Sequence, residues 1–142
     1  MNQKYIIGLI GSIREGYNKF LEKELDKKGI TGLVSSHGAI LSVLYKHNGT
    51  LPVLQIADLI NRTKSTVTEL IAKLEKNEYV IKKPNPDDKR STLIELTKKG
   101  QSIQQSFYEI SENLIKTTYK GFTEEEKDQL IALLLKVKKN FK

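Results

Sequence analysis

The chain has 142 residues, and its 24 lysines and arginines outnumber its 17 acidic residues, which gives a net charge of +7. This length favours one domain, or two small lobes that share a core, and the composition is that of a globular protein. Because the chain contains no cysteine, disulfides, thiolate metal sites and cysteine nucleophiles are excluded. The positive charge favours an anionic partner but does not identify it.

The first predicted helix covers about residues 4–27. Its apolar residues recur at helical spacing, and Lys27-Lys28-Gly29 is a typical helix end. Residues 5–13 superficially resemble the core of a signal peptide, but they are too short to cross a bilayer and lead directly into Arg14. We therefore expect a buried helix in a cytoplasmic protein that does not bind membranes.

Further elements follow in chain order. Apolar spacing predicts three helices, over about residues 35–48, 53–60 and 64–77. The period then changes to two, which predicts strands at Tyr79–Lys83 and Thr92–Leu96 on either side of a charged, proline-containing loop. A long helix over residues 98–120 comes next, and Thr123 and Glu126 form a capping box before a last helix.

The first and last helices carry more apolar residues than one face of a small monomer can bury. The run Leu133-Leu134-Leu135 extends around more than half of its helix. Such a helix must be covered on two sides. We consider two explanations, a dimer interface and a purely intramolecular core, and the dimer is the more economical.

The candidate functional residues lie on the two helices predicted between Val53 and Asn77. The second is expected to bury Val67, Leu70, Ile71 and Leu74, which leaves on its outer side Ser65, Thr66, Thr68, Glu69, Ala72 and Lys73. Short hydroxyls at a helix N-terminus, with lysines beside them, suit the major groove of DNA. Locally, an alternative stays open, in which Thr63 and Ser65 only cap the helix and the other polar residues are solvated.

The predicted hairpin decides between these alternatives. A charged loop with one arginine, directly after such a helix, is typical of a wing. Its tip at Asp87–Arg90 can reach the neighbouring minor groove, where an inserted arginine detects narrow width and negative potential. The predicted fold is therefore mainly α with a small β-hairpin wing, and it combines a winged helix-turn-helix domain with a helical dimerisation domain.

Residues Ile56 to Thr97 resemble the winged helix of the multiple-antibiotic-resistance regulator (MarR) family. Three strings carry the resemblance: Lys64-Ser65-Thr66-Val67-Thr68, Leu74-Glu75-Lys76, and Pro86-Asp87-Asp88-Lys89-Arg90 followed by Leu96-Thr97. Asp88 and Arg90 match the D-x-R signature of the family's wing, with Leu-Thr at the expected distance. The flanking helices fit as well, so the resemblance covers essentially the whole chain.

The resemblance implies a transcriptional regulator, most simply a repressor, that binds a pseudo-palindromic operator in double-stranded DNA as a homodimer. Residues 35–97 would form the winged domain, and residues 1–34 and 98–142 the dimerisation region. Implied DNA contacts are Ser36, His37, Lys64, Ser65, Thr66, Thr68, Lys73, Asp88, Lys89 and Arg90. Arg62 at the entrance to the helix over residues 64–77 and Glu69 on its outer side are further candidate contacts. A small anionic or phenolic effector that releases DNA by changing the lobe spacing is also suggested.

The chain departs from the family's pattern at two positions. Glu69 stands where relatives often have a basic residue, so it either weakens phosphate attraction or accepts a hydrogen bond from cytosine N4. Glu78 stands where a glycine usually closes the helix, and a left-handed conformation there would store strain.

Several residues keep more than one interpretation. His37 is a phosphate contact, a pocket residue or a residue that only lies near a helix start. The tyrosines either pack in the core or line an effector pocket, namely Tyr5, Tyr17, Tyr45, Tyr108 and Tyr119.

No catalytic constellation or phosphate-binding glycine loop is present, and Glu124, Glu125 and Glu126 are better explained as a charged first helical turn than as a metal site. We therefore expect no enzyme, no metal and no cofactor. The competing hypothesis is a winged-helix module that binds protein, such as an antirepressor or scaffold, which would need neither Arg90 nor the hydroxyl face.

Overall fold

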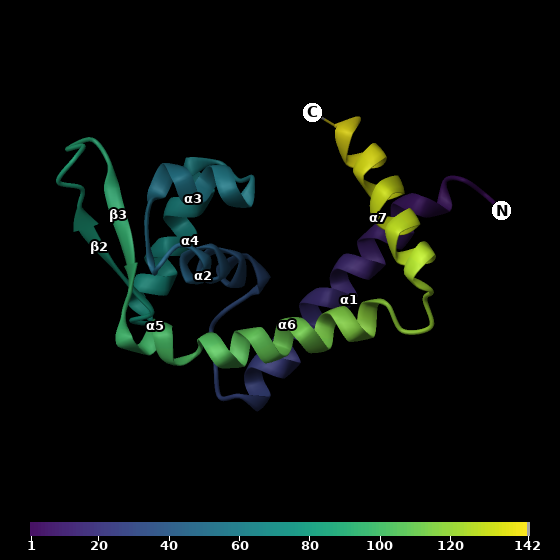
Figure 1. The fold of residues 1–142 in the computed structure, drawn as a ribbon, viewed down its shortest axis with the longest axis horizontal. Helices are drawn as coiled ribbons and strands as arrows, with labels where there is room; N and C mark the ends of the chain where they lie inside the picture. The colour runs from purple at the N-terminus through teal and green to yellow at the C-terminus, as the bar shows by residue number, and fades with distance from the viewer. Residues whose placement is uncertain (142) are drawn as a thin grey trace. The chain divides into compact units, whose positions relative to one another are not determined.

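The structure, a computed structural model, describes residues 1–141 as ten elements (Figure 1). They are α1 (Tyr5–Lys27), α2 (Ser35–Lys46), β1 (Thr50–Pro52), α3 (Val53–Ile60), α4 (Lys64–Lys76), β2 (Val80–Pro84), β3 (Thr92–Leu96), α5 (Lys98–Ser102), α6 (Gln104–Thr118) and α7 (Glu124–Lys139). The mainly helical fold with a hairpin wing is confirmed. The chain divides into two compact units, Met1–Ile110 and the residues from Ser111 onward. The expected division into DNA-binding and dimerisation regions stays a prediction.

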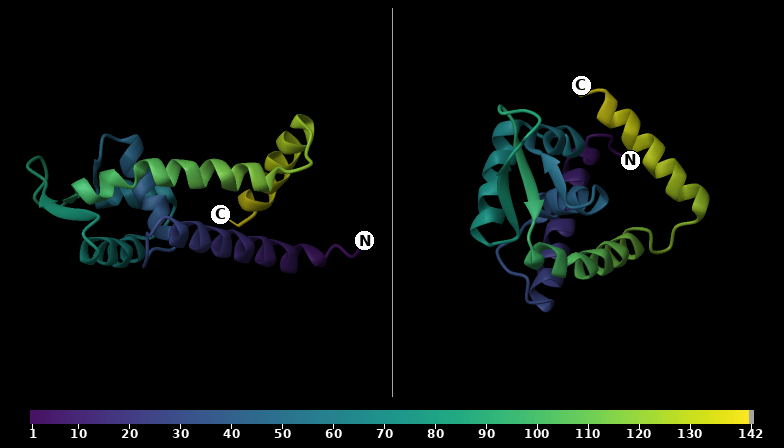
Figure 2. Two further views of the ribbon diagram at one scale, coloured as in Figure 1. Left: turned by 90° about the horizontal axis from the view of Figure 1, so that it is seen from below. Right: turned by 60° about the vertical axis from the view of Figure 1, so that its left-hand side comes forward.

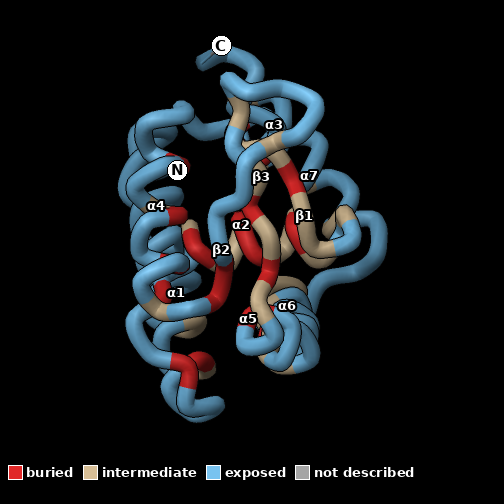
Figure 3. Tube along the Cα trace, turned by 90° about the vertical axis from the view of Figure 1, so that its left-hand side faces the viewer, coloured by how far each residue is buried: buried red, intermediate tan, exposed pale blue. Residues whose placement is uncertain are grey.

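The core of the first unit lies among α2, α3, α4 and the sheet. We refer to residues 30–100 as the winged lobe. Figure 3 shows its buried positions on α2, α4 and the strands. Fully buried side chains of the lobe include Ile40, Leu41, Leu44, Ile56, Val67, Leu74, Val80 and Ile94. This core places α4 and the hairpin on one scaffold, because both contribute to the same cluster.

The sheet has three antiparallel strands in the order β1-β3-β2. Strands β2 and β3 form the hairpin, with Val80 opposite Leu96 and Pro84 opposite Thr92. Strand β1 pairs with the other edge of β3, with Thr50 opposite Glu95. Figures 1 and 2 show the loop of the hairpin projecting away from helices α2, α3 and α4.

Two predicted features differ from the structure. Strand β1 was not expected, because three residues ending in Pro52 are too few to show a period of two. The single helix expected over residues 98–120 is interrupted at Ile103, where α5 ends and α6 follows. At this break the Tyr45 hydroxyl donates a hydrogen bond of 2.6 Å to the Gly100 carbonyl, the group that a continuous helix pairs with the N–H of Gln104.

Two apolar helices lack cover within their own units. Every residue from 1 to 19 is exposed, so the expected burial of α1 is met only towards Leu25. Within Glu124–Lys139 of the second unit no residue is buried, although Leu133, Leu134 and Leu135 are among them. Searching residues 1–141, we find no helix with the length and apolarity needed to span a membrane.

Candidate nucleic-acid interface

Helix α4 starts at a fixed point, because its first turn is capped by a side chain. Asn61 ends α3 in the left-handed conformation, with φ of +56°. The Thr63 hydroxyl oxygen then accepts a hydrogen bond of 3.2 Å from the Thr66 N–H. An N-cap threonine satisfies one of the unpaired donors at a helix start, so the capping role considered for Thr63 is confirmed.

The two faces of α4 divide as predicted. Val67, Ile71 and Leu74 are at most 1% exposed, and Leu70 is half-buried. The opposite side forms an exposed stripe at spacings of four, three and four residues, which we refer to as the outer stripe: Ser65, Glu69, Ala72 and Lys76. Sequence reasoning missed Lys76 as a candidate contact, although the same helical spacing identifies it.

Two of the hydroxyls expected to contact DNA, those of Thr66 and Thr68, already have partners within the chain. The Thr63 hydroxyl donates to the Thr66 hydroxyl oxygen at 3.0 Å, and the Thr68 hydroxyl donates to the Lys64 carbonyl at 2.8 Å. Ser65 and Glu69 have no side-chain hydrogen bond or ion pair with any residue from 1 to 141. The free polar groups of the outer stripe are therefore the Ser65 hydroxyl, the Glu69 carboxylate and the Lys76 ammonium group.

The wing tip is ordered around Asp88. Its Oδ1 accepts a hydrogen bond of 2.9 Å from the Arg90 N–H and lies 3.8 Å from the Arg90 Nε. Its carbonyl accepts from the Ser91 N–H at 3.0 Å. The Arg90 side chain nevertheless stays 96% exposed. The geometry agrees with the role implied for Asp88, which is to hold the turn so that the arginine projects into solvent.

Ion pairs connect the wing to its surroundings. The Lys82 ammonium lies 3.6 Å from the Glu75 carboxylate on α4, and Lys83 lies 2.6 Å from Glu95 on the neighbouring strand. The hydrogen bond from Lys83 is the main reason that the pKa of Glu95 lies below its ordinary value. The first pair therefore ties strand β2 to α4, and the second ties the two strands of the hairpin to each other.

A groove separates α4 from the wing. It has a volume of about 200 Å³ and is lined from α4 by Lys64, Thr68 and Ile71. From the wing side it is lined by Lys82, Arg90, Ser91 and Thr92. Three cationic side chains, from α4 and from the wing, thus line one groove, and one of them, Lys82, is also paired with Glu75.

The other end of α4 is held by the start of α5. The Thr97 hydroxyl donates to the Glu78 carbonyl at 2.6 Å, and the Lys99 ammonium donates to the Asn77 carbonyl at 2.8 Å. Gly100 makes the approach possible, because a Cβ at this position would lie 2.2 Å from the Tyr79 carbonyl oxygen. Glu78 has a φ of +65°, which is the left-handed conformation considered from the sequence.

Comparison with known proteins agrees with this geometry. Residues 33–92 match the sequence profile of the MarR family. Over 131 residues the chain is 30% identical to the HTH-type transcriptional regulator MhqR of Bacillus subtilis (strain 168). The aligned residues make up 92% of this chain and 85% of MhqR. The chain belongs to the MarR family of transcriptional regulators.

Two further proteins show how far the similarity extends. The uncharacterised HTH-type transcriptional regulator YkoM of Bacillus subtilis (strain 168) is 36% identical over 98 residues, which is 69% of this chain but only 63% of YkoM. The DNA complex of MepR from S. aureus contains a chain of the same fold, with a TM-score of 0.81 and 24% identity over 100% of this chain and 99% of that one. The winged helix-turn-helix architecture expected from the MarR resemblance is thereby confirmed.

At the start of α2, the two residues implied as DNA contacts by the MarR resemblance differ in exposure. Ser36 is half-buried, whereas His37 is only 3% exposed. The Nδ1 atom of His37 accepts a hydrogen bond of 3.0 Å from the Val34 N–H. Burial first, and the charge of Lys73 second, lower the pKa of this histidine. Because its ring is committed to the helix start, the structure does not support a DNA contact for His37.

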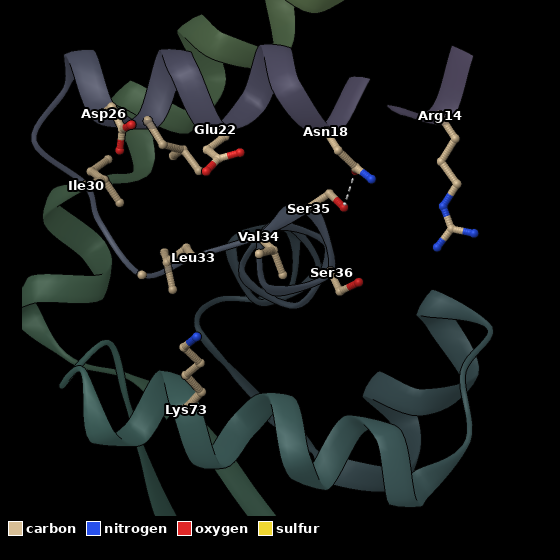
Figure 4. Close-up of a pocket in the computed structure, with 12 residues that line it drawn as sticks. Arg14, Asn18, Glu22, Asp26, Ile30, Leu33, Val34, Ser35, Ser36 and Lys73 are labelled. Carbon is tan, nitrogen blue, oxygen red and sulfur yellow. Dashed lines mark hydrogen bonds between the residues drawn. The ribbon is translucent and has the colours of Figure 1, made fainter. Parts of the chain in front are cut away.

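A pocket of about 400 Å³ lies between α1, the start of α2 and α4 (Figure 4). Arg14 extends from α1 and Lys73 from α4, while Ser35 donates a hydrogen bond of 3.0 Å to Asn18 at its edge. Leu25, Ile30 and Leu33 form apolar parts of the lining, and Glu22 and Asp26 add carboxylates. Lys73 therefore lies on the side of α4 that meets the pocket, at the margin of the predicted DNA-binding face.

None of the tyrosines lines this pocket within the described chain. Tyr45 packs against Phe107, with ring centroids 6.4 Å apart, and burial raises its pKa. Core packing therefore accounts for Tyr45, whereas Tyr5 and Tyr108 are more than 60% exposed. In residues 1–141, no group of three or more histidine, aspartate and glutamate side chains is placed to hold a metal ion.

Proposed function

We propose that this MarR-family chain regulates transcription by binding double-stranded DNA in a sequence-specific way. Helix α4 enters the major groove with its outer stripe, and the wing tip reaches the adjacent minor groove. The observation that carries this proposal is the groove lined by Lys64 from α4 and by Lys82 and Arg90 from the wing. Helix α4 and the exposed Arg90 side chain therefore border the same groove and can contact one DNA duplex together.

The proposed contacts fall into three groups. Ser65, Glu69 and Lys76 of the outer stripe face the bases or their flanking phosphates. Phosphates are contacted by Ser36 at the start of α2, by Arg62 before α4, by Lys64 with the neighbouring Thr66 and Thr68, and by Lys89 in the wing, with Lys73 at the margin of this face. Arg90 enters the minor groove, where negative potential favours a guanidinium, and Asp88 holds its loop.

The uncovered apolar helices support the proposal of a homodimer. Ile6, Ile10 and Ile13 of α1 are 44–49% exposed, and Leu133, Leu134 and Leu135 of α7 are 47–59% exposed. Apolar patches of this kind mark interfaces, and a two-fold axis is the commonest way to cover them. Two copies would place two α4 helices in successive major grooves of a pseudo-palindromic operator, about one helical turn apart.

The pocket between α1 and α4 suits a small anionic or phenolic effector. Arg14 and Lys73 offer positive charge, the carboxylates of Glu22 and Asp26 accept hydrogen bonds from a phenol, and the leucines supply apolar contact. An effector held by both helices favours one placement of α4 relative to α1. A changed half-site spacing then weakens operator binding without altering any base contact, which is the action of a repressor released by its ligand.

Titration with nonspecific duplex DNA at several salt concentrations tests DNA binding itself. We expect the logarithm of the binding constant to fall linearly with the logarithm of salt concentration, because each neutralised phosphate releases counterions. A slope near zero would exclude DNA binding and favour the protein-binding module instead.

The Arg90→Ala variant tests the wing. We expect operator affinity to fall by about 1–3 kcal/mol, because the contact of Arg90 with the minor groove is lost. The fold should be unaffected, since the Arg90 side chain is almost fully exposed. Lys120→Ala is the control for removing one positive charge, since Lys120 is exposed and lies outside α4, the wing and the pocket. If Arg90→Ala changes only the melting temperature and not the affinity, the proposed role of the wing is wrong.

Binding of a hydroxybenzoate tests the pocket. We expect it to raise the melting temperature of the wild-type protein and to weaken its DNA binding, because it stabilises one arrangement of α1 and α4. Arg14→Gln should reduce both effects. Equal effects on wild type and variant would exclude this pocket as the effector site.

A further inference from the structure

The Glu69 carboxylate lies in the middle of the outer stripe without a partner. Lys73 follows it by four residues, a spacing at which exposed helices commonly form ion pairs, but the two side chains form no ion pair in the described chain. Lys73 instead extends from α4 into the lining of the pocket near Leu33 (Figure 4). The negative charge of Glu69 therefore stays uncompensated on the face proposed to meet DNA.

The hydroxyls of the two neighbouring threonines are less free to read bases than the Glu69 carboxylate. Those of Thr66 and Thr68 are both engaged in hydrogen bonds within the chain, at 3.0 and 2.8 Å. Ser65 remains free, but a hydroxyl both donates and accepts, so it pairs with several bases. Among the free groups of the outer stripe, only the Glu69 carboxylate accepts hydrogen bonds without donating any.

This acceptor distinguishes the four base edges of the major groove. Guanine and thymine present acceptors, which repel a carboxylate, while cytosine presents its N4 amino group as a donor. Adenine also has an amino donor, but the N7 acceptor beside it disfavours a negative charge. A carboxylate turned towards the phosphates would likewise be repelled, so its favourable position is against a base.

We infer that Glu69 is a specificity-determining residue that selects cytosine at one position in each half-site. The inference rests on the proposed function, since it requires α4 to enter the major groove. It predicts a contact that supplies discrimination rather than general affinity. Wrong bases at this position should weaken binding on the order of tenfold to a hundredfold, as is typical of a good base contact.

Selection from a duplex library tests the inference. The library carries a randomised core of about two helical turns, and it is bound by the wild-type protein, Glu69→Gln, Glu69→Ala and the control Glu112→Gln. Glu112 is an exposed residue of α6, so its replacement makes the same change in net charge outside α4. Folding is checked by the melting temperature of each variant.

The expected results differ between the variants. Wild type and Glu112→Gln should enrich cytosine at one fixed position per half-site. Glu69→Gln should enrich adenine there, because a glutamine amide pairs with N6 and N7 together, and Glu69→Ala should show no preference at that position while keeping the others. If Glu69→Ala enriches the same bases as wild type and only binds all duplexes more tightly, Glu69 acts as a bulk charge and the inference is overturned.

Direct affinity measurements complete the test. The selected duplex and a version with that cytosine replaced by thymine are titrated with wild type and Glu69→Ala. We expect wild type to discriminate between the two duplexes tenfold or more, and the variant to show nearly no discrimination. The difference between the two ratios measures the interaction of Glu69 with that cytosine. Equal discrimination by both proteins would overturn the inference alone. Failure of wild type to enrich any sequence, together with a salt slope near zero, would overturn the proposed function and this inference with it.

Discussion

The winged lobe and the two terminal helical segments, residues 5–19 and α7, are similar in apolar content but differ in what covers them. The lobe encloses Ile40, Leu44 and Ile56 completely, at 0% exposure. Residues 5–19 and α7 bury no side chain within their own units. The contrast teaches that the lobe carries its own core, whereas the terminal segments expose apolar faces that the proposed second copy would cover. Four predictions test this contrast, in order of decreasing effect.

The largest effect is expected from Leu134→Glu in α7. The side chain is 47% exposed in a single chain, so the substitution leaves the unit itself intact. In the proposed dimer it would bury an unpaired charge, at a cost of about 3–5 kcal/mol. Sedimentation velocity should show a monomer at concentrations at which wild type is dimeric.

Leu59→Glu is the matched control, because Leu59 is equally exposed, at 46%, but belongs to the winged lobe. It should leave the dimer unchanged. Dissociation by both substitutions, or by neither, would contradict the division between the lobe and the terminal helices.

Gly100→Ala is expected to destabilise the winged lobe by about 3 kcal/mol, since the new methyl group would lie 2.2 Å from a main-chain oxygen that cannot rotate away. Urea unfolding measures the change. Gly11→Ala is the control, because no atom lies within 4 Å of its Cβ, and alanine in a helix interior gains about 0.5–1 kcal/mol. Similar unfolding free energies for the two variants would show that the contact between α5 and the segment after α4 is not tight.

Glu78→Gly should raise the free energy of unfolding by about 0.5–1 kcal/mol. Glycine removes the cost of a left-handed conformation at φ of +65°, and part of that gain is offset by the greater freedom of glycine in the unfolded chain. Asn61→Gly should gain less, because asparagine tolerates the same conformation. An unchanged or lower melting temperature for Glu78→Gly would refute the strain.

The smallest effect is expected from His37. Its pKa is lowered in the folded state, so the unfolded chain takes up a proton first as the pH falls below the ordinary value of 6.5. Stability is therefore complete above that value and declines as the pH falls towards the lowered folded pKa. His37→Asn retains an acceptor for the Val34 N–H but does not titrate, so its unfolding free energy should depend less on pH between pH 7.5 and 5.5 than that of wild type. If the unfolding free energies of wild type and variant change with pH in parallel, His37 is not the source of the pH dependence.

Much of the winged lobe could be predicted because its signals are local. The cap at Thr63, the inward positions of α4 and the turn around Asp88 each depend on residues within a few positions of one another. Strand β1 could not be predicted, because it pairs with a strand more than 40 residues away. The break at Ile103 could not be predicted for the same reason, since it involves a hydrogen bond from Tyr45 of α2 to the Gly100 carbonyl, far along the chain.

The candidate interface was predictable in outline but not in its chemistry. Helical spacing places Ser65 and Glu69 on one face. It does not show that the Thr66 and Thr68 hydroxyls already have partners, because those hydrogen bonds depend on rotamers. Spacing also does not reveal that Lys73 turns towards the pocket, which requires the placement of the α1–α2 connection.

The contact of Gly100 with the Tyr79 carbonyl has a consequence for genetics. Position 100 lies in α5, outside the groove-lining residues, yet every side chain other than hydrogen would collide with a main-chain atom there. A screen for loss of operator binding should therefore recover substitutions at this codon as often as at codon 90. Second-site suppressors will be scarce, because the clash is with the main-chain carbonyl of residue 79, and a substitution elsewhere cannot remove a main-chain atom.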